Sequence, residues 1–124
     1  DTEIDITAQT GIKSLDVTID CDNLDARELG TMGIPARFDL CNIEGFEDTN
    51  GTMHPAEDVR EAISALGFPI EDAVKDKPSI RLKIDKMFTR LLTGFPGNNN
   101  FILTVTENNG LSTTKTLKYY VPAN

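Results

Sequence analysis

The chain has 124 residues and a formal net charge of −8, with 20 Asp and Glu against 12 Lys and Arg. This length suits one domain, and a hydrophobic fraction of 39% is enough for a packed core. The acidic balance argues against a nucleic acid or an anionic membrane as a partner, because both attract clustered Lys and Arg. The sequence also contains no apolar run long enough for a transmembrane segment.

Alternating apolar residues predict strands at the start of the chain. Ile4 and Ile6 flank an acidic residue, which indicates a short strand. From Leu15 to Cys21 apolar and polar residues alternate, which indicates a half-buried strand with one polar face. Residues 38–40 form a shorter candidate strand.

Capping signals predict helices in the middle of the chain. Asp25 with Glu28 three residues later is typical of the start of a short helix. Pro55 in a first-turn position, followed by acidic residues, opens the clearest helix and predicts a helical insertion at about 54–69. The residues of this helix that form one apolar stripe are Val59, Ala62, Ile63 and Leu66. The polar stretch 44–54 before it predicts a surface loop.

A pattern of Gly, an apolar residue and Pro occurs at Gly33, Gly67 and Gly94. Helices commonly end in this way, with the glycine in the left-handed conformation. We interpret the pattern as recurring helix termination, because the segments before the three copies differ in length. The third copy would end a helix that starts at Asp85 and carries the apolar residues Met87, Phe88, Leu91 and Leu92.

The C-terminal part predicts three further strands, at 80–84, 101–106 and 116–121. Asn108-Asn109-Gly110 is typical of a tight turn, so the last two strands should form a hairpin. The inward residues of all the strands form the predicted core: Ile4, Ile6, Leu15, Val17, Ile19, Phe38, Leu40, Ile80, Leu82, Ile84, Phe101, Leu103, Val105, Leu117, Tyr119 and Val121.

Residues capable of catalysis or metal binding are sparse. His54 is the only histidine, and directly before Pro55 it is expected to be a solvent-exposed residue near a helix start. One His and two Cys match no usual zinc spacing. Oxygen ligands for Ca²⁺ are dense over 20–25, but the sequence departs from an EF-hand loop at Leu24, which favours helix capping. We therefore predict no enzymatic activity and no cofactor.

Cys21 and Cys41 are compatible with one disulfide or with two half-buried thiols, and strand parity counts against the disulfide. Arg81, Lys118 and Tyr120 are expected on the outward face of the C-terminal strands, among threonines. They are candidates for a small ligand-binding patch. The alternative is a polar sheet face whose charges discourage edge-to-edge aggregation.

Both ends of the chain resemble a known kind of module. The segments 11–15 (GIKSL) and 20–24 (DCDNL) resemble the start of immunoglobulin-like modules in surface lipoproteins of gut-dwelling Gram-negative bacteria, a family of unknown function. Residues 100–110 and 113–117 are similar to the closing hairpin of bacterial immunoglobulin-like and PKD-like domains. With the alternating pattern, this implies a mainly β, Ig-like antiparallel sandwich of roughly six or seven strands with short helical insertions, as one domain over 1–124.

The resemblance also implies an exported protein at the cell surface, in the outer membrane or in the periplasm, with a lipid anchor on an N-terminal cysteine. The sequence starts at Asp1, without an initiator Met or a basic-then-apolar leader, so we expect either a removed signal segment or a trimmed chain.

The predicted function is a non-catalytic structural or protein-interaction module whose partners are other domains or surface proteins. The alternative is a glycan-binding module of a surface polysaccharide-uptake system. The absence of Trp counts against glycan binding, because sugar rings prefer broad aromatic faces.

Overall fold

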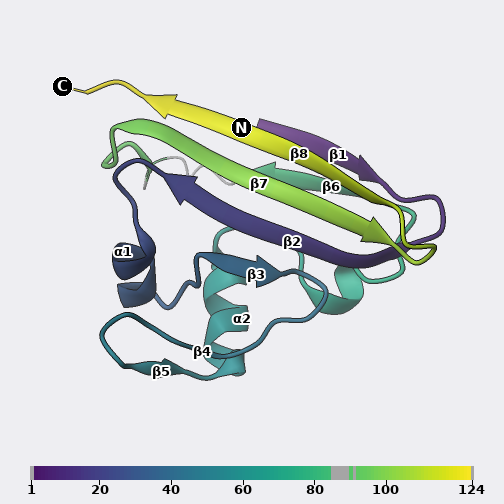
Figure 1. The fold of residues 1–124 in the computed structure, drawn as a ribbon, viewed down its shortest axis with the longest axis horizontal. Helices are drawn as coiled ribbons and strands as arrows, with labels where there is room; N and C mark the ends of the chain where they lie inside the picture. Colours follow the sequence, from purple (N-terminus) through teal and green to yellow (C-terminus); the bar gives the residue numbers. More distant parts are fainter. Residues whose placement is uncertain (1, 85–89, 91, 124) are drawn as a thin grey trace.

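The computed structural model describes residues 2–84, 90 and 92–123. Its strands form antiparallel sheets, and short helices lie between the early and the late strands, so the predicted mainly β fold is confirmed (Figure 1). In one sheet, β1 (Thr2–Thr7) pairs with β6 (Ser79–Ile84). The other sheet has the order β3 (Arg37–Asp39), β2 (Ile12–Cys21), β7 (Gly97–Glu107) and β8 (Ser112–Val121).

The strand order is that of an immunoglobulin-like sandwich. In that fold strands B and E pair in one sheet, and strands C′, C, F and G lie in this order in the other. The pair β1–β6 corresponds to B–E, and β3–β2–β7–β8 corresponds to C′–C–F–G. Among the described residues no strand pairs with the outer edges of β1 and β6.

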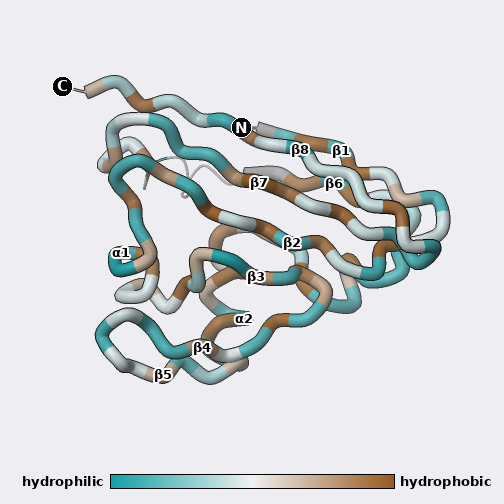
Figure 2. Tube along the Cα trace, in the orientation of Figure 1, coloured by the Kyte–Doolittle hydropathy of each residue, from teal (hydrophilic) through white to brown (hydrophobic). Residues whose placement is uncertain are grey.

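The core lies between the two sheets. Buried and more exposed residues alternate along β2 and β7, and most of the buried ones are apolar. Figure 2 shows hydrophobic and hydrophilic residues along both strands. Most of the predicted core is buried, while the side chains of Ile4, Ile80, Leu117 and Tyr119 are half-buried against it. The prediction for the Ile84 side chain lies outside the described residues. The buried predicted residues are Ile6, Leu15, Val17, Ile19, Phe38, Leu40, Leu82, Phe101, Leu103, Val105 and Val121.

The first two α-helices start at the segments that the sequence indicates. In α1 (Ala26–Thr31) the Asp25 side chain accepts a hydrogen bond from the Glu28 N–H at 2.9 Å. Helix α2 (Ala56–Ala65) buries its stripe into the core, and Pro55 is its N-cap instead of a first-turn residue. The predicted third helix lies outside the described residues, apart from Arg90 and the buried Leu92.

The glycine pattern is confirmed after these two helices and wrong at the third position. Gly33 follows α1 with φ 76°, and Gly67 follows α2 with φ 97°. Gly94 does not have a positive φ; Gly97, three residues later, has φ 102°. A side chain at Gly97 would meet the carboxylate of Asp22 at 2.7 Å, so the close approach of two segments requires glycine there.

The segment expected to be a surface loop is a small hairpin of β4 (Phe46–Glu47) and β5 (Met53–His54). Its turn is ordered by Asp48, whose Oδ1 accepts hydrogen bonds from the N–H groups of Asn50 and Thr52 at 2.9 and 3.0 Å. Polar composition alone did not reveal this pairing, because an Asp side chain supplies turn bonds that hydrophobic periodicity cannot indicate.

The core also includes apolar residues of the connecting segments. These residues do not belong to an alternating or helical apolar pattern, so no period marks them as buried. A short 3₁₀ helix, η1 (Glu71–Ala73), lies in the last of these segments. The buried residues outside the predicted set that come from turns and connections are Ala8, Leu24, Ile34, Ile43, Phe68 and Val74.

Candidate functional site

The predicted ligand patch does not form one surface. Lys118 and Tyr120 lie on the outer face of β8, opposite Asn100 and Asn98 of β7. Arg81 belongs to β6 in the other sheet, so it faces outward on the opposite side of the sandwich. The prediction that the three residues share a face is therefore wrong, because sequence alternation does not reveal which sheet a strand joins.

Arg81 is held by acidic neighbours on β1. Its Nε donates a hydrogen bond to Asp5 Oδ1 at 2.9 Å, and its Nη1 lies 4.0 Å from Glu3 Oε2. The hydrogen bond to Asp5 raises the pKa of the guanidinium above its usual value. The guanidinium of Arg81 is thus already engaged by neighbouring carboxylates.

Cys21 and Cys41 are both free, half-buried thiols. Cys21 ends β2, whereas Cys41 follows Leu40, whose N–H donates to the Leu15 carbonyl at 2.9 Å. The strand from Leu15 to Cys21 spans roughly 20 Å, and a disulfide needs Cα atoms closer than about 7 Å. Burial raises the pKa of each thiol from 9.0 to about 11, which keeps both thiols protonated at neutral pH.

The acidic stretch after β2 serves local structure. Asp25 caps α1, and Asp22 Oδ2 accepts a hydrogen bond from the Asn98 N–H at 2.8 Å. Asn23 donates from its side-chain amide to the carbonyl of Pro96. Asp25 therefore caps the helix as predicted, whereas the contacts of Asp22 and Asn23 tie the start of α1 to the start of β7.

His54 is half-buried, so the expectation of a solvent-exposed residue is wrong. Its Nε2 lies 2.8 Å from Asp48 Oδ2, and its ring stacks on Phe46 with centroids 4.8 Å apart and an interplanar angle of 16°. The hydrogen bond with His54 holds the pKa of Asp48 below its usual value of 3.8. Pairing of β4 with β5 brings these side chains together, and they fix the hairpin against α1, where a Cβ at Gly30 would meet Asp48 at 2.8 Å.

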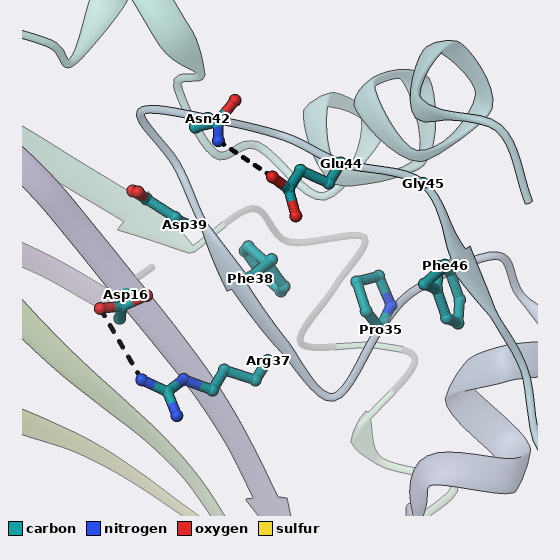
Figure 3. A pocket seen from close by; sticks show the side chains of 9 residues that line it. All are labelled: Asp16, Pro35, Arg37, Phe38, Asp39, Asn42, Glu44, Gly45 and Phe46. Atoms are coloured by element: carbon teal, nitrogen blue, oxygen red, sulfur yellow. Dashed lines mark hydrogen bonds and ion pairs between the residues drawn. The ribbon is translucent and has the colours of Figure 1, made fainter.

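An open groove of about 500 Å³ lies between β3 and the start of β4 (Figure 3). Its polar side is charged: Arg37 Nη2 lies 3.9 Å from Asp16 Oδ2, and Asn42 Nδ2 donates to Glu44 Oε1 at 3.2 Å. The rings of Pro35, Phe38 and Phe46 form its apolar side. The groove can offer hydrogen-bond donors and acceptors to a polar ligand, and its residues come from elements that sequence reasoning did not connect.

Asp39, which also lines this groove, has a structural role. Its Oδ1 accepts hydrogen bonds from the N–H groups of Leu15 at 3.0 Å and Cys41 at 2.9 Å. This carboxylate is half-buried and completes the outer edge of β2 beyond the short strand β3.

The outer edge of β8 is the largest unpaired main-chain surface that the register defines. The Glu107 N–H donates to the Leu111 carbonyl, so alternate residues from there face β7, and the main-chain groups between them point away. Within the described part of the chain, nothing pairs with those outward groups. The residues that present them are Ser112, Thr114, Thr116, Lys118 and Tyr120.

Lys115 reaches from β8 to the other sheet. Its Nζ donates a hydrogen bond to the Asp5 carbonyl at 3.0 Å. Because Ala8 N–H bonds to the Pro78 carbonyl and continues the β1–β6 ladder, the main-chain groups of Asp5 point to the open edge of β1. The lysine therefore occupies an acceptor that a neighbouring strand would use.

Sequence reasoning selected Lys118 and Tyr120 but missed Lys115 and the edge itself. A signal was present, because residues 112–116 are polar at every position, whereas a strand with one buried face alternates. Continuous polarity in the last strand of a hairpin is typical of an edge.

No protein-family model, curated protein or solved structure matches this chain. In the described part of the chain, no helix is long and apolar enough to cross a membrane.

Proposed function

We propose that the chain is a non-catalytic structural or protein-interaction module of an exported bacterial protein at the cell surface. The observation that carries this proposal is the open edge of β8, a ten-residue strand that pairs with β7 alone among the residues that the structure describes. An unpaired strand is a template for another chain, and strand addition is a common way in which proteins recognise extended segments.

The chemistry of the candidate catalytic groups supports a binding role over catalysis. His54 is engaged by Asp48 and stacked on Phe46. Cys21 and Cys41 have pKa values raised to about 11 by burial, which is opposite to the lowered pKa of a nucleophilic cysteine. Export and a surface location are supported by the resemblance of both chain ends to surface lipoprotein modules.

Site-specific photo-crosslinking in the cells that produce the protein tests this proposal. A photoreactive residue at Thr116, on the β8 edge, should give a discrete adduct with another protein. The same residue at Thr49, exposed in the β4–β5 turn, serves as the matched control and should not give that adduct. Cell fractionation in the same experiment reports the location. Absence of any adduct from positions 114, 116 and 118 would contradict an interaction through this edge.

Glycan binding is the second candidate, favoured by the groove with its carboxylates, amide and apolar rings. Affinity electrophoresis against bacterial and plant polysaccharides tests it, with Glu44→Ala in the groove and Tyr120→Ala on β8 as variants. Retardation that Glu44→Ala abolishes would place glycan in the groove, and retardation that Tyr120→Ala abolishes would place it on the β8 face. Equal mobility of all proteins with and without polysaccharide contradicts this candidate.

A further inference from the structure

The β8 edge differs in charge from the rest of the molecule. The strand carries Lys115 and Lys118 and no acidic residue, although the chain has a net charge of −8. Lys118 is exposed, and no described residue forms an ion pair with either lysine. A positive edge on an acidic protein attracts an acidic partner and steers its approach.

The two faces of β8 require different side chains from a strand added beside it. On the outer face an incoming residue would lie beside Lys118, where a carboxylate is favourable. On the inner face it would lie beside Leu117 and Tyr119, which are only half-buried against the core, so an apolar residue there would extend the core. Alternation of acidic and apolar residues satisfies both faces at once.

Exposed apolar side chains stand at both ends of the same edge. Leu111, directly before β8, is 62% exposed, and Tyr120, near its end, is 67% exposed. Large apolar side chains at the border of a main-chain edge add contact area for a partner strand.

A second copy of this chain is a poor occupant. Antiparallel pairing of two β8 strands would bring the lysines of both copies close together, and like charges on neighbouring strands are destabilising. The lysines therefore disfavour pairing of β8 with a second copy of itself and favour pairing with an acidic strand. Specific binding commonly combines repulsion of one partner with attraction of another in this way.

We propose that β8 accepts, as an added strand, an extended segment of a partner protein in which acidic and apolar residues alternate. This inference rests on the proposed interaction function and specifies its partner. The segment pairs with the outward main-chain groups of Thr114, Thr116 and Lys118. Where it passes β1, N–H groups on its far edge can replace Lys115 at the Asp5 carbonyl.

Binding of synthetic peptides to the full chain tests this inference. The probe is a fluorescent peptide that alternates Glu with Val and matches β8 in length, and the control peptide has Lys in place of Glu. We expect the Glu peptide to bind at least about tenfold more tightly at low salt, since several Lys residues in place of Glu turn attraction to the lysine-bearing edge into repulsion. Hydrogen exchange should slow at the amides of Thr114, Thr116 and Lys118.

Two variants separate the main-chain and charge contributions. Thr116→Pro removes an outward N–H and no ladder bond to β7, so it should reduce binding of the Glu peptide by more than about tenfold while the fold remains. Lys118→Glu should shift the preference toward the Lys peptide. Lys13→Glu makes the same change in net charge on the exposed end of β2 and should leave the preference unchanged.

The outcomes distinguish this inference from the proposed function. Equal affinity for the Glu and Lys peptides, or a preference that Lys118→Glu does not alter, overturns the acidic partner. If Thr116 nevertheless crosslinks to a protein in cells, the interaction function stands and only the partner chemistry is wrong. If positions 114, 116 and 118 give no adduct either, both proposals are wrong.

Discussion

Strands β2 and β8 have the same length and belong to the same sheet, yet their environments differ sharply. β2 pairs with β7 on one side and with β3 and flanking residues on the other, and its inward side chains are buried. In the described part of the chain β8 pairs with β7 alone, and most of its residues are exposed. The difference shows that position in the sheet, and not strand length, decides which strand holds the fold together and which is free to bind.

Introduction of a charge should give the largest difference in stability between variants of β2 and variants of β8. Val17→Asp on β2 places a carboxylate at a fully buried position between Phe38 and Leu103, and we expect a loss of more than about 4 kcal/mol in the free energy of unfolding. Thr116→Asp on β8 should change it by no more than about 1 kcal/mol. Thermal unfolding followed by circular dichroism measures both, and near-wild-type stability of Val17→Asp would refute the core assignment.

Proline substitution should give the next largest difference in stability between variants of the two strands. Thr18→Pro on β2 removes an N–H that the register directs to β7, and should cost about 3 kcal/mol or more. Thr116→Pro removes only an N–H on the open edge and should cost about 1 kcal/mol or less. Urea unfolding curves compare them. Similar losses in both variants would mean that the β8 edge is paired in solution.

A smaller effect is expected where a side chain completes the edge of β2. Asp39→Ala leaves the N–H groups of Leu15 and Cys41 without their acceptor, which should cost about 1–3 kcal/mol in the free energy of unfolding. Asp39→Asn keeps a carbonyl oxygen at the same position and should retain most of the stability. Equal destabilisation by both variants, measured in urea, would show that the charge and not the acceptor matters.

The alkylation rates of cysteine thiols on β2 and β8 compare the two strands under conditions in which the stability of the protein hardly changes. A pKa of about 11 at Cys21, against 9.0 for a free thiol, predicts alkylation by iodoacetamide at pH 8 that is about 100-fold slower than for a thiol on β8. Thr114→Cys in a Cys41→Ala background supplies that reference thiol. Reaction of Cys21 at the rate of the introduced cysteine would disprove the burial effect.

The same shift has a defined consequence for stability. Because the folded state raises the pKa of Cys21 and Cys41, it favours the protonated thiols, and their contribution is fully present below pH 9.0. It decreases as the pH rises from 9.0 toward 11, since the unfolded chain ionises first.

Sequence periodicity predicted the main strands and their inward faces, but it predicted much less about how the surface residues are arranged. The alternation at Leu15, Val17 and Ile19 identified β2 and its inward face, and Asp25 marked the start of α1. The patch of Arg81 with Lys118 failed because both residues lie on outward faces of strands, but those strands belong to different sheets. His54 was misplaced because its partners, Phe46 and Asp48, are brought to it by a hairpin whose residues lack hydrophobic alternation.

The sequence by itself determined an acidic, mainly β chain, its principal strands and the inward face of each, because strand periodicity and turn chemistry are local properties. Only the tertiary structure decided which strands share a sheet, which edge remains unpaired and which polar residues are buried. These outcomes depend on contacts between distant segments, such as Lys115 with the Asp5 carbonyl, that no local pattern encodes. The fold also places a lysine-bearing strand at the open edge of the sheet, so a positively charged edge lies on a protein whose net charge is negative.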